Sequence, residues 1–281
     1  MIKLIVDSTS EFSYEEAKEL GLVYLPITIN FDGEELKEGI DISKSDFYNR
    51  MESSSTLSKT SQITPFQYTE AIQEVIDEGN TPVIITLSSN LSGTYSSAMI
   101  AASEFDNVTV IDSESASIGE KILILYALDL IKNGCSSVEE LIDKINEKKK
   151  KIGIYFLIDT LTYLQKGGRI SKFGSLAGNF LSVKPLLSII DNEIAVVAKS
   201  RGFNKGHLIL KDKIDEMGEI DYDMPFLLSY SGNNSHVLDK YIDKYEDIFQ
   251  TKIHDIPIVQ IGSSVGTHMG PNSVGVAFFY K

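Results

Sequence analysis

The stretch PVIITLSSNLSGTYSSA, Pro82–Ala98, combines a strand, a loop and the start of a helix. Val83–Leu87 is a short apolar run rich in β-branched residues, which predicts a buried strand. Ser88–Gly93 is a loop of small polar residues, and the pattern from Thr94 onward predicts a helix. The loop hydroxyls therefore lie where a strand ends and a helix begins. Free backbone N–H groups and the helix dipole favour an anion at such a position.

Two further segments repeat this arrangement. The predicted strand Ile2–Val6 leads into Asp7–Ser10, and Lys59–Thr64 leads into a helix that begins at Pro65. Ser and Thr are also common helix caps, so capping is the alternative interpretation of each loop. Three such entrances, with few charges and no metal ligands, predict a neutral hydrogen-bonding pocket for one carboxylate or phosphate. Gly93 is expected to let the backbone approach a ligand closely.

The order of the predicted elements indicates an α/β fold with two domains. Up to about residue 150 strands alternate with helices, which predicts a three-layer α/β/α domain with a mostly parallel sheet. Beyond it, Leu186–Ile190 and Glu193–Lys199 predict a hairpin around Asp191-Asn192, so the second sheet is mixed. We expect domains at 1–152 and 153–281, the second a two-layer α/β domain. Ligands of such sheets bind at the carboxyl ends of parallel strands.

Composition narrows the class of protein. The 281 residues are 42% hydrophobic, which is enough for a substantial core. A net charge of −14 argues against nucleic acid or an anionic membrane as the main partner. The single cysteine, Cys135, excludes an intramolecular disulfide framework and a cysteine zinc cluster. No secretory signal pattern and no bilayer-spanning apolar run are visible, so we expect a soluble, cytoplasmic protein.

The segment Gly262–Gly266, GSSVG, fits the G-x-S-x-G pattern of serine hydrolases. In that enzyme class an acid and a histidine follow the serine along the chain. After Ser264 the only histidine is His268, and no Asp or Glu follows. A triad in that order cannot be assembled. A hydrolase or acyl transferase that uses Ser264 or Ser92 remains the alternative function.

Three other residues are candidates for ligand contact. His268 lies in a glycine-rich turn, which predicts a ligand-facing side chain, and an ordinary core or surface histidine is the alternative. Arg169 follows Gly167-Gly168 and Arg201 precedes Gly202, and arginine binds carboxylates and phosphates bidentately. The alternative for both is a surface arginine. No pair of carboxylates stands out, no nucleotide-binding motif is present, and no metal or cofactor is expected.

Together these motifs resemble the DegV family, bacterial fatty-acid-binding proteins that include the acyl-carrier subunit of fatty acid kinase. The similarity covers essentially the whole chain. Ile63 and Asn90 depart from residues that are frequent in the family, Pro and Gly, without removing a hydrogen-bonding side chain. The matching stretches, in the family's order, are Ile5–Phe12, Thr60–Pro65, Leu87–Ala98, Val110–Ser117, Ile158–Ser171 and Ile261–Pro271.

The resemblance implies one long-chain fatty acid bound between two domains. Its carboxylate would be held by the hydroxyls of Thr60 or Ser61, the hydroxyl of Ser92 and backbone N–H groups around Gly93. His268 would complete this network from the second domain. Arg169 would lie at the pocket mouth, and Arg201 would lie on the face that meets a kinase.

The resemblance also implies a partner. A dihydroxyacetone-kinase-like subunit of fatty acid kinase would supply ATP and Mg²⁺ and phosphorylate the bound carboxyl group to an acyl phosphate. The chain itself would be a carrier without catalytic residues, with transient membrane contact for lipid exchange. A lipid-responsive regulator without a kinase is a further alternative.

Gly167-Gly168 is the predicted hinge for lipid release. A predicted helix, Lys172–Leu181, offers residues that would line the tunnel or belong to the core: Phe173, Leu176, Ala177, Phe180 and Leu181.

Overall fold

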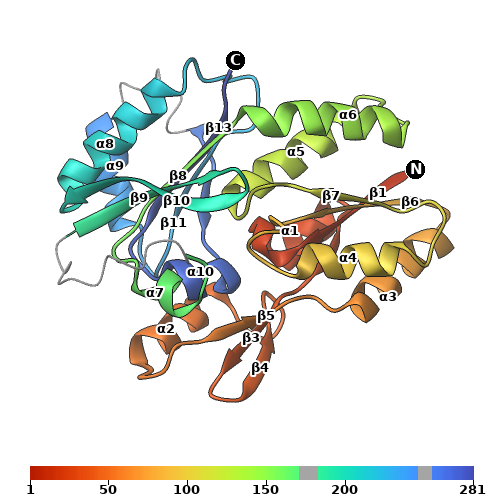
Figure 1. The fold of residues 1–281 in the computed structure, drawn as a ribbon, viewed down its shortest axis with the longest axis horizontal. Coiled ribbons are helices and arrows are strands. Elements are labelled where there is room, and N and C mark those ends of the chain that lie inside the picture. The colour runs from red at the N-terminus through yellow and green to blue at the C-terminus, as the bar shows by residue number, and fades with distance from the viewer. Residues whose placement is uncertain (171–182, 246–254) are drawn as a thin grey trace.

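The first sheet is parallel and lies within a three-layer arrangement. The computed structural model describes residues 1–170, 183–245 and 255–281 (Figure 1). The strand order is β2-β1-β6-β7, all parallel, with β1 (Ile2–Asp7), β2 (Val23–Leu25), β6 (Thr81–Thr86) and β7 (Thr109–Asp112). Successive side chains of β1 point to opposite faces and both sets are buried, as in sheets covered on both sides. The fold class predicted for the first half is confirmed.

Five helices cover this sheet. One face packs against α3 (Pro65–Asp77) and α4 (Thr94–Ala102). The other face packs against α1 (Tyr14–Glu19), α5 (Ile118–Lys132) and α6 (Val138–Lys148). Thr64 caps α3, and its Oγ1 accepts from the Gln67 N–H at 3.3 Å. The capping interpretation is therefore correct for this residue.

The second sheet is mixed, as predicted. Its strand order is β10-β9-β8-β13-β11-β12, and of its pairings only β11 with β12 is parallel. The hairpin turn at Asp191 and Asn192 is confirmed, and both residues have positive φ angles of 50° and 66°. Its strands are β8 (Ile152–Leu157), β9 (Val183–Ile190), β10 (Glu193–Arg201), β11 (Leu227–Tyr230), β12 (Ile258–Gln260) and β13 (Val274–Phe279).

Helices pack on both faces of the second sheet. On one face lie α8 (Phe203–Glu216) and the described helix α9 (His236–Tyr245). On the other face, Ile118 and Ile122 of α5 join one hydrophobic cluster with residues of β8 and β13. Because α5 also packs on the first sheet, it links the two halves of the molecule. The division at 152/153 stays a prediction.

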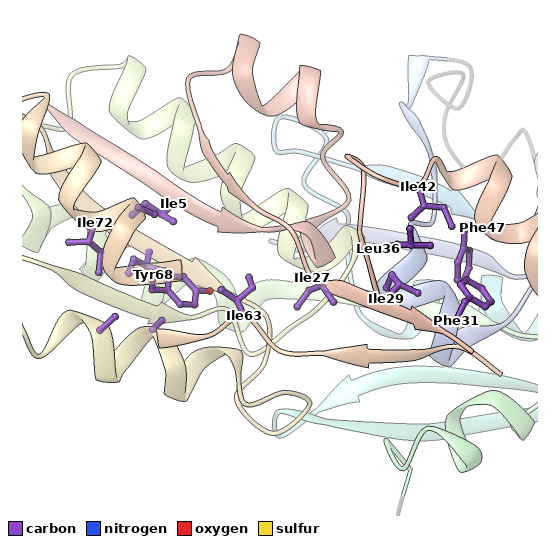
Figure 2. Packing of buried hydrophobic residues seen from close by; sticks show 14 of the residues in the cluster. Ile5, Ile27, Ile29, Phe31, Leu36, Ile42, Phe47, Ile63, Tyr68 and Ile72 are labelled. Atoms are coloured by element: carbon purple, nitrogen blue, oxygen red, sulfur yellow. The ribbon is translucent and has the colours of Figure 1, made fainter. Parts of the chain in front are cut away.

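A third sheet was not predicted. The residues of the run 23–31 favour a single strand, but the run breaks at Pro26, which has no N–H to donate to a ladder. β2 therefore belongs to the first sheet, while β3 (Thr28–Phe31) pairs with β4 (Glu34–Lys37) and β5 (Lys59–Ser61) in the order β4-β3-β5. Figure 2 shows the core continuing from Ile5 and Tyr68 through Ile27 to Phe31 and Phe47. The third sheet thus extends the core of the first.

Shorter elements complete the described chain. They are the 3₁₀ turns Ser8–Ser10 and Lys149–Lys151 and the helices α2 (Lys44–Ser53), α7 (Thr162–Lys166) and α10 (Ser263–Met269). The predicted helix Lys172–Leu181, with its apolar residues, lies outside the described residues. In the described part of the chain, no helix combines the length and the apolar character needed to cross a bilayer.

Candidate functional site

One cavity lies where the three sheets meet. Its wall is formed by residues of the second and third sheets and by the loops that follow the four strands of the first sheet. A mostly apolar wall with a few polar groups is typical of small-molecule sites. Apolar side chains form much of its wall: Ile27, Leu87, Leu91, Phe156, Leu164, Leu187, Ile189, Ile194, Val265 and Met269. Polar side chains of the wall form two groups. The first polar group is Thr60 and His268 with their neighbours, and the second polar group is Thr9, Ser117 and Ser264.

The structure brings most of the predicted ligand contacts to this cavity. Thr60, Ser61, Ser92, Arg169 and His268 all line it, although they come from β5, the β6–α4 loop, the segment after α7, and α10. Ser61 is exposed, so this polar group lies at the solvent side. Sequence positions more than 200 apart thus meet in one site.

Gly93 and Arg201 are placed elsewhere. Gly93 begins α4 beside the cavity, and its φ of −71° is open to any residue. A Cβ at this position would collide with the side chain of Gln62, which does line the cavity and donates to Ser97 Oγ at 2.8 Å. The close packing of Gln62 therefore accounts for a glycine at position 93, and no special backbone conformation is needed there. Arg201 lies exposed at the end of β10 and does not line the cavity.

His268 and Thr60 form the centre of the head group site, by which we mean Thr60, Ser61, Ser92, Arg169 and His268. Thr60 Oγ1 lies 2.9 Å from His268 Nε2. Burial, and then the charge of Arg169, lowers the pKa of His268 to about 4, so the ring is neutral at neutral pH. Its Nδ1 is buried without a hydrogen-bond partner among the described residues. A neutral ring with Nε2–H donates to Thr60 and leaves the Thr60 proton free for a ligand.

The two glycines of the predicted hinge lie beside the head group site, and their role in lipid release stays a prediction. A Cβ at Gly167 would collide with the His268 ring, so this glycine makes room for the histidine. Gly168 has a φ of +72°, which favours glycine, and open space around it. Arg169 Nη1 then donates to the Gly167 carbonyl at 2.7 Å and Nε to the Leu91 carbonyl at 3.3 Å. These bonds place a guanidinium charge at the cavity wall.

Ser92 fits both interpretations of the hydroxyl-rich loops, helix capping and a position facing the cavity. Its Oγ accepts from the Thr94 N–H at 3.2 Å and donates to Thr94 Oγ1 at 2.9 Å. It therefore stabilises the start of α4 while lining the cavity.

Sequence reasoning missed a group of buried carboxyls behind the second polar group. Asp7, Glu11, Glu38 and Glu120 are all at most 4% exposed, which contradicts the expectation of few charges and of no notable carboxylate pair. These four residues, hereafter the carboxyl cluster, come from distant segments. Glu38 follows the third sheet, which the sequence pattern did not reveal. The acidic residues in DSTSE at 7–11, after a strand, were the available signal.

Burial raises the pKa of three members of this cluster. It raises the pKa of Asp7 to about 6 and that of Glu11 to about 7, and it raises the Glu120 pKa well above its ordinary value. Thr9 Oγ1 contacts both Asp7 and Glu120, yet it has one proton to donate. Glu120 is therefore expected to be protonated and to donate to Thr9. Within the described residues, no group of three or more His, Cys, Asp or Glu side chains is arranged so that it could hold a metal ion.

The Ser264 alternative loses its geometric support. Ser264 lies in helix α10 with no unusual φ, whereas a nucleophile elbow is a strained turn. Its Oγ donates to Glu38 and its N–H donates to Glu38 Oε1 at 2.9 Å. His268 contacts Thr60 instead. Among the described residues no histidine contacts the Ser264 hydroxyl, and the Glu38 carboxyl that accepts from it also accepts from Ser8.

Known proteins resemble this chain over its full length. A DegV domain-containing protein of Caldanaerobacter subterraneus subsp. tengcongensis is 31% identical and covers 100% of this chain and 99% of its own length. The solved structure of DegV, a fatty acid binding protein from Bacillus subtilis, has 29% identity and a TM-score of 0.83, with 100% and 99% coverage. A stearic acid-binding protein from Eubacterium ventriosum has 26% identity and a TM-score of 0.85, with the same coverage.

The family model described as "Uncharacterised protein, DegV family" matches residues 1–281, every position of the sequence. The whole-length relatives and the structural similarity agree with this match. The chain belongs to the DegV family.

Proposed function

We propose that this chain binds one long-chain fatty acid in the cavity, with the carboxylate at the head group site. One observation carries the proposal: a single cavity joins an apolar wall to a cluster of hydroxyls, a neutral histidine and an arginine. The Bacillus subtilis and Eubacterium ventriosum relatives, described as fatty acid- and stearic acid-binding, support the choice of ligand.

The head group site suits a carboxylate. His268 Nε2–H holds the oxygen of Thr60, so the Thr60 hydroxyl donates its proton to the ligand. Ser61 and Ser92 are the neighbouring hydroxyls, and Arg169 supplies a positive charge. Hydrogen bonds to a charged acceptor are stronger than neutral ones. The site therefore orients the carboxylate without burying an unpaired charge.

The apolar wall provides most of the affinity. Each methylene removed from water contributes ~0.8 kcal/mol, so a sixteen-carbon tail contributes on the order of 10 kcal/mol before binding costs. The polar residues then decide orientation and head group recognition.

The carrier role is the second part of the proposal. Thr60, Arg169 and His268 also line a surface depression with Lys59 and Lys166, so the polar end of the cavity adjoins solvent. A dihydroxyacetone-kinase-like subunit would bring ATP and Mg²⁺ to this side. A carboxylate oxygen would attack the γ-phosphorus, ADP would leave, and an acyl phosphate would form. In this proposal the chain contributes no catalytic group, Arg201 belongs to the docking face, and lipid exchange involves transient membrane contact.

Native mass spectrometry of the purified chain, with mass analysis of its organic extract, tests the binding. One long-chain fatty acid per chain is the expected result, and it would also identify the preferred tail. A chain that is empty and takes up no added fatty acid would contradict the proposal.

A phosphorylation assay with a purified fatty acid kinase subunit tests the carrier role. Acyl phosphate formation that requires this chain is expected. A chain that binds fatty acid but supports no phosphorylation with any such kinase would favour the lipid-responsive regulator. Fatty acyl ester turnover that disappears in Ser264→Ala would favour the hydrolase.

A further inference from the structure

Helix α10 carries His268, and its amino end is capped by side chains that are distant in sequence. The helix has no capping side chain of its own at Gly262. Instead, Glu11 Oε2 accepts from the Gly262 N–H at 2.6 Å, and Glu38 Oε1 accepts from the Ser264 N–H at 2.9 Å. Glu38 also accepts from the Ser264 hydroxyl. Two carboxyls from the first 40 residues thus bind the free N–H groups that begin this helix.

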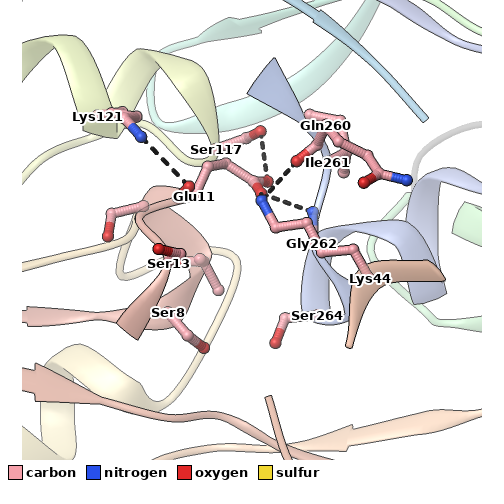
Figure 3. A network of polar contacts seen from close by, with 12 residues as sticks. Ser8, Glu11, Ser13, Lys44, Ser117, Lys121, Gln260, Ile261, Gly262 and Ser264 are labelled. Atoms are coloured by element: carbon pink, nitrogen blue, oxygen red, sulfur yellow. Dashed lines mark hydrogen bonds and ion pairs between the residues drawn. The ribbon is translucent and has the colours of Figure 1, made fainter. Parts of the chain in front are cut away.

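These two carboxyls are themselves held in place. Ser8 Oγ donates to Glu38 Oε2 at 2.6 Å and accepts from the Ile27 N–H at 2.9 Å. Figure 3 shows Glu11 between Ser117, whose Oγ donates to Oε1 at 2.8 Å, and Gly262. A Cβ at Gly262 would collide with Glu38, so glycine permits this close approach. Ser8, Ser117 and Gly262 are buried, and the partly exposed Lys44 adds an ion pair, with its Nζ 3.6 Å from Glu11 Oε2.

The third sheet contacts α10 at both of its ends. Glu38 directly follows β4, and its N–H donates to the Ile27 carbonyl at 3.0 Å. Thr60 lies in β5 and reaches His268. Ile29 of β3 is the register partner of both Leu36 and Thr60, so the two contacts are parts of one sheet.

The spacing along the helix matches this arrangement. Ser264 and His268 are four residues apart, so they lie on one face of α10, one turn from each other. Between them, Thr267 Oγ1 lies 2.8 Å from Ser58 Oγ, just before β5. The sheet therefore determines both the position and the rotation of the helix.

We propose that Glu38 is a positioning residue for the head group site, because it holds α10 so that His268 meets Thr60. This inference rests on the proposed function for its effect on binding. A carboxylate that accepts from two donors of Ser264 binds the helix more strongly than a neutral acceptor. Without it, two donors at the start of the helix lose their partner, and the His268 ring leaves its buried position.

The test uses Glu38→Ala and Glu38→Gln in the full chain, with palmitate as the probe. Glu38→Ala is expected to weaken palmitate binding about tenfold, and Glu38→Gln less, because glutamine keeps one acceptor. NMR of the histidine rings between pH 5 and 8 is the second readout. His268 stays neutral over this range in the parent chain, and in Glu38→Ala it should titrate near its ordinary value because solvent reaches the ring.

Glu120→Gln is the matched control. Glu120 is equally buried and belongs to the same carboxyl cluster, but it contacts Thr9 rather than α10. The Glu120→Gln substitution should leave the titration of the His268 ring unchanged. An equal shift in Glu120→Gln, or none in Glu38→Ala, would overturn the proposal.

A double-mutant cycle with Thr60→Val separates positioning from general stability. The Thr60→Val effect on palmitate binding should be smaller in the Glu38→Ala background, since a Thr60 hydroxyl without the His268 contact is no longer oriented toward the carboxylate. Additive effects would overturn the proposal. If Glu38→Ala does not fold, Ser264→Ala removes one of the two contacts and should shift His268 in the same direction by less. If the parent chain binds no palmitate, the binding proposal fails, while the ring titration still decides the positioning role.

Discussion

The two polar groups of the cavity use the same residue types in opposite ways. At the head group site, the hydroxyl of Thr60 lies beside a neutral histidine, near the charge of Arg169. At the other group, Ser117 and Ser264 donate their protons to buried carboxyls. With His268 protonated on Nε2, Thr60 keeps its proton for an anion. Ser92 donates only to a neutral hydroxyl, whereas Ser117 and Ser264 donate to carboxyls, which are stronger acceptors when ionised. The hydrogen-bond partner of a hydroxyl therefore decides whether that hydroxyl can donate to an anion.

This comparison also assigns the orientation of the proposed ligand. A carboxylate near Ser264 or Ser117 would meet hydroxyls whose protons already go to Glu38 and Glu11, while the positive charge of Arg169 favours it at the head group site. The second polar group instead stabilises the fold where the sheets meet. Substitutions should therefore separate into those that change stability and those that change affinity.

The largest effect is expected for the carboxyl cluster. Glu38→Ala should lower the free energy of unfolding by about 3 kcal/mol, because it leaves the Ser264 N–H and two hydroxyls without their buried acceptor. Urea unfolding measures this change. Glu35→Ala, on the exposed face of the same hairpin, is the control and should change stability by less than about 0.5 kcal/mol. A loss below about 1 kcal/mol for Glu38→Ala would contradict the assigned role.

The head group site should respond in affinity instead. Thr60→Val should weaken fatty acid binding about tenfold, since one hydrogen bond to a charged acceptor contributes on the order of 1.5 kcal/mol. Its free energy of unfolding should change by less than about 1 kcal/mol. Titration calorimetry with palmitate measures the affinity, and Thr69→Val on α3 is the matched control. Unchanged binding in Thr60→Val would mean that the carboxylate lies elsewhere.

The pH dependence of the free energy of unfolding should also distinguish the carboxyl cluster from the head group site. The Glu11 pKa rises from 4.5 in the unfolded chain to about 7 in the folded protein, so the folded state binds more protons in that window. The free energy of unfolding should therefore increase by about 1 kcal/mol as pH falls from 8 to 6.5. His268 acts in the opposite direction, because its pKa falls from 6.5 to about 4 on folding and only the unfolded chain binds this proton near pH 6.5. It lowers the free energy of unfolding by about 0.4 kcal/mol at pH 6.5, less than the gain from Glu11.

Unfolding at several pH values checks this sign. Glu11→Gln should flatten the dependence, because the glutamine side chain does not titrate. A parent chain whose stability rises with pH over the same interval would refute the prediction.

The smallest effects come from a matched pair of serines. Ser92→Ala at the head group site should weaken fatty acid binding about threefold. Ser117 lines the same cavity, but its hydroxyl already donates to Glu11. Ser117→Ala should therefore leave the affinity for fatty acid within about twofold of the parent. Binding measured in parallel for both variants decides the comparison. Equal losses would show that the two polar groups are not different in kind.

Much of the fold followed from local patterns. Apolar runs such as Val83–Leu87 and the turn at Asp191-Asn192 predicted strands and a hairpin that the structure confirms. The third sheet did not follow from them, because Pro26 splits an otherwise continuous strand pattern and sends its two parts to different sheets. The lining role of Thr60, Ser61, Ser92, Arg169 and His268 was predicted from motifs, whereas Gln62 was missed because an exposed glutamine has no distinctive pattern.

The sequence by itself determined the alternation of strands and helices, the mixed second sheet and the hydroxyl-rich loops. These depend on side-chain periodicity and on turn residues, which act over a few positions. Only the tertiary structure decided which hydroxyls face a ligand. Ser264 donates to Glu38, 226 residues away, and Thr60 meets His268, 208 residues away. The protonation of a carboxyl or an imidazole depends on burial and on neighbours brought together by folding, and no local pattern in the sequence records either.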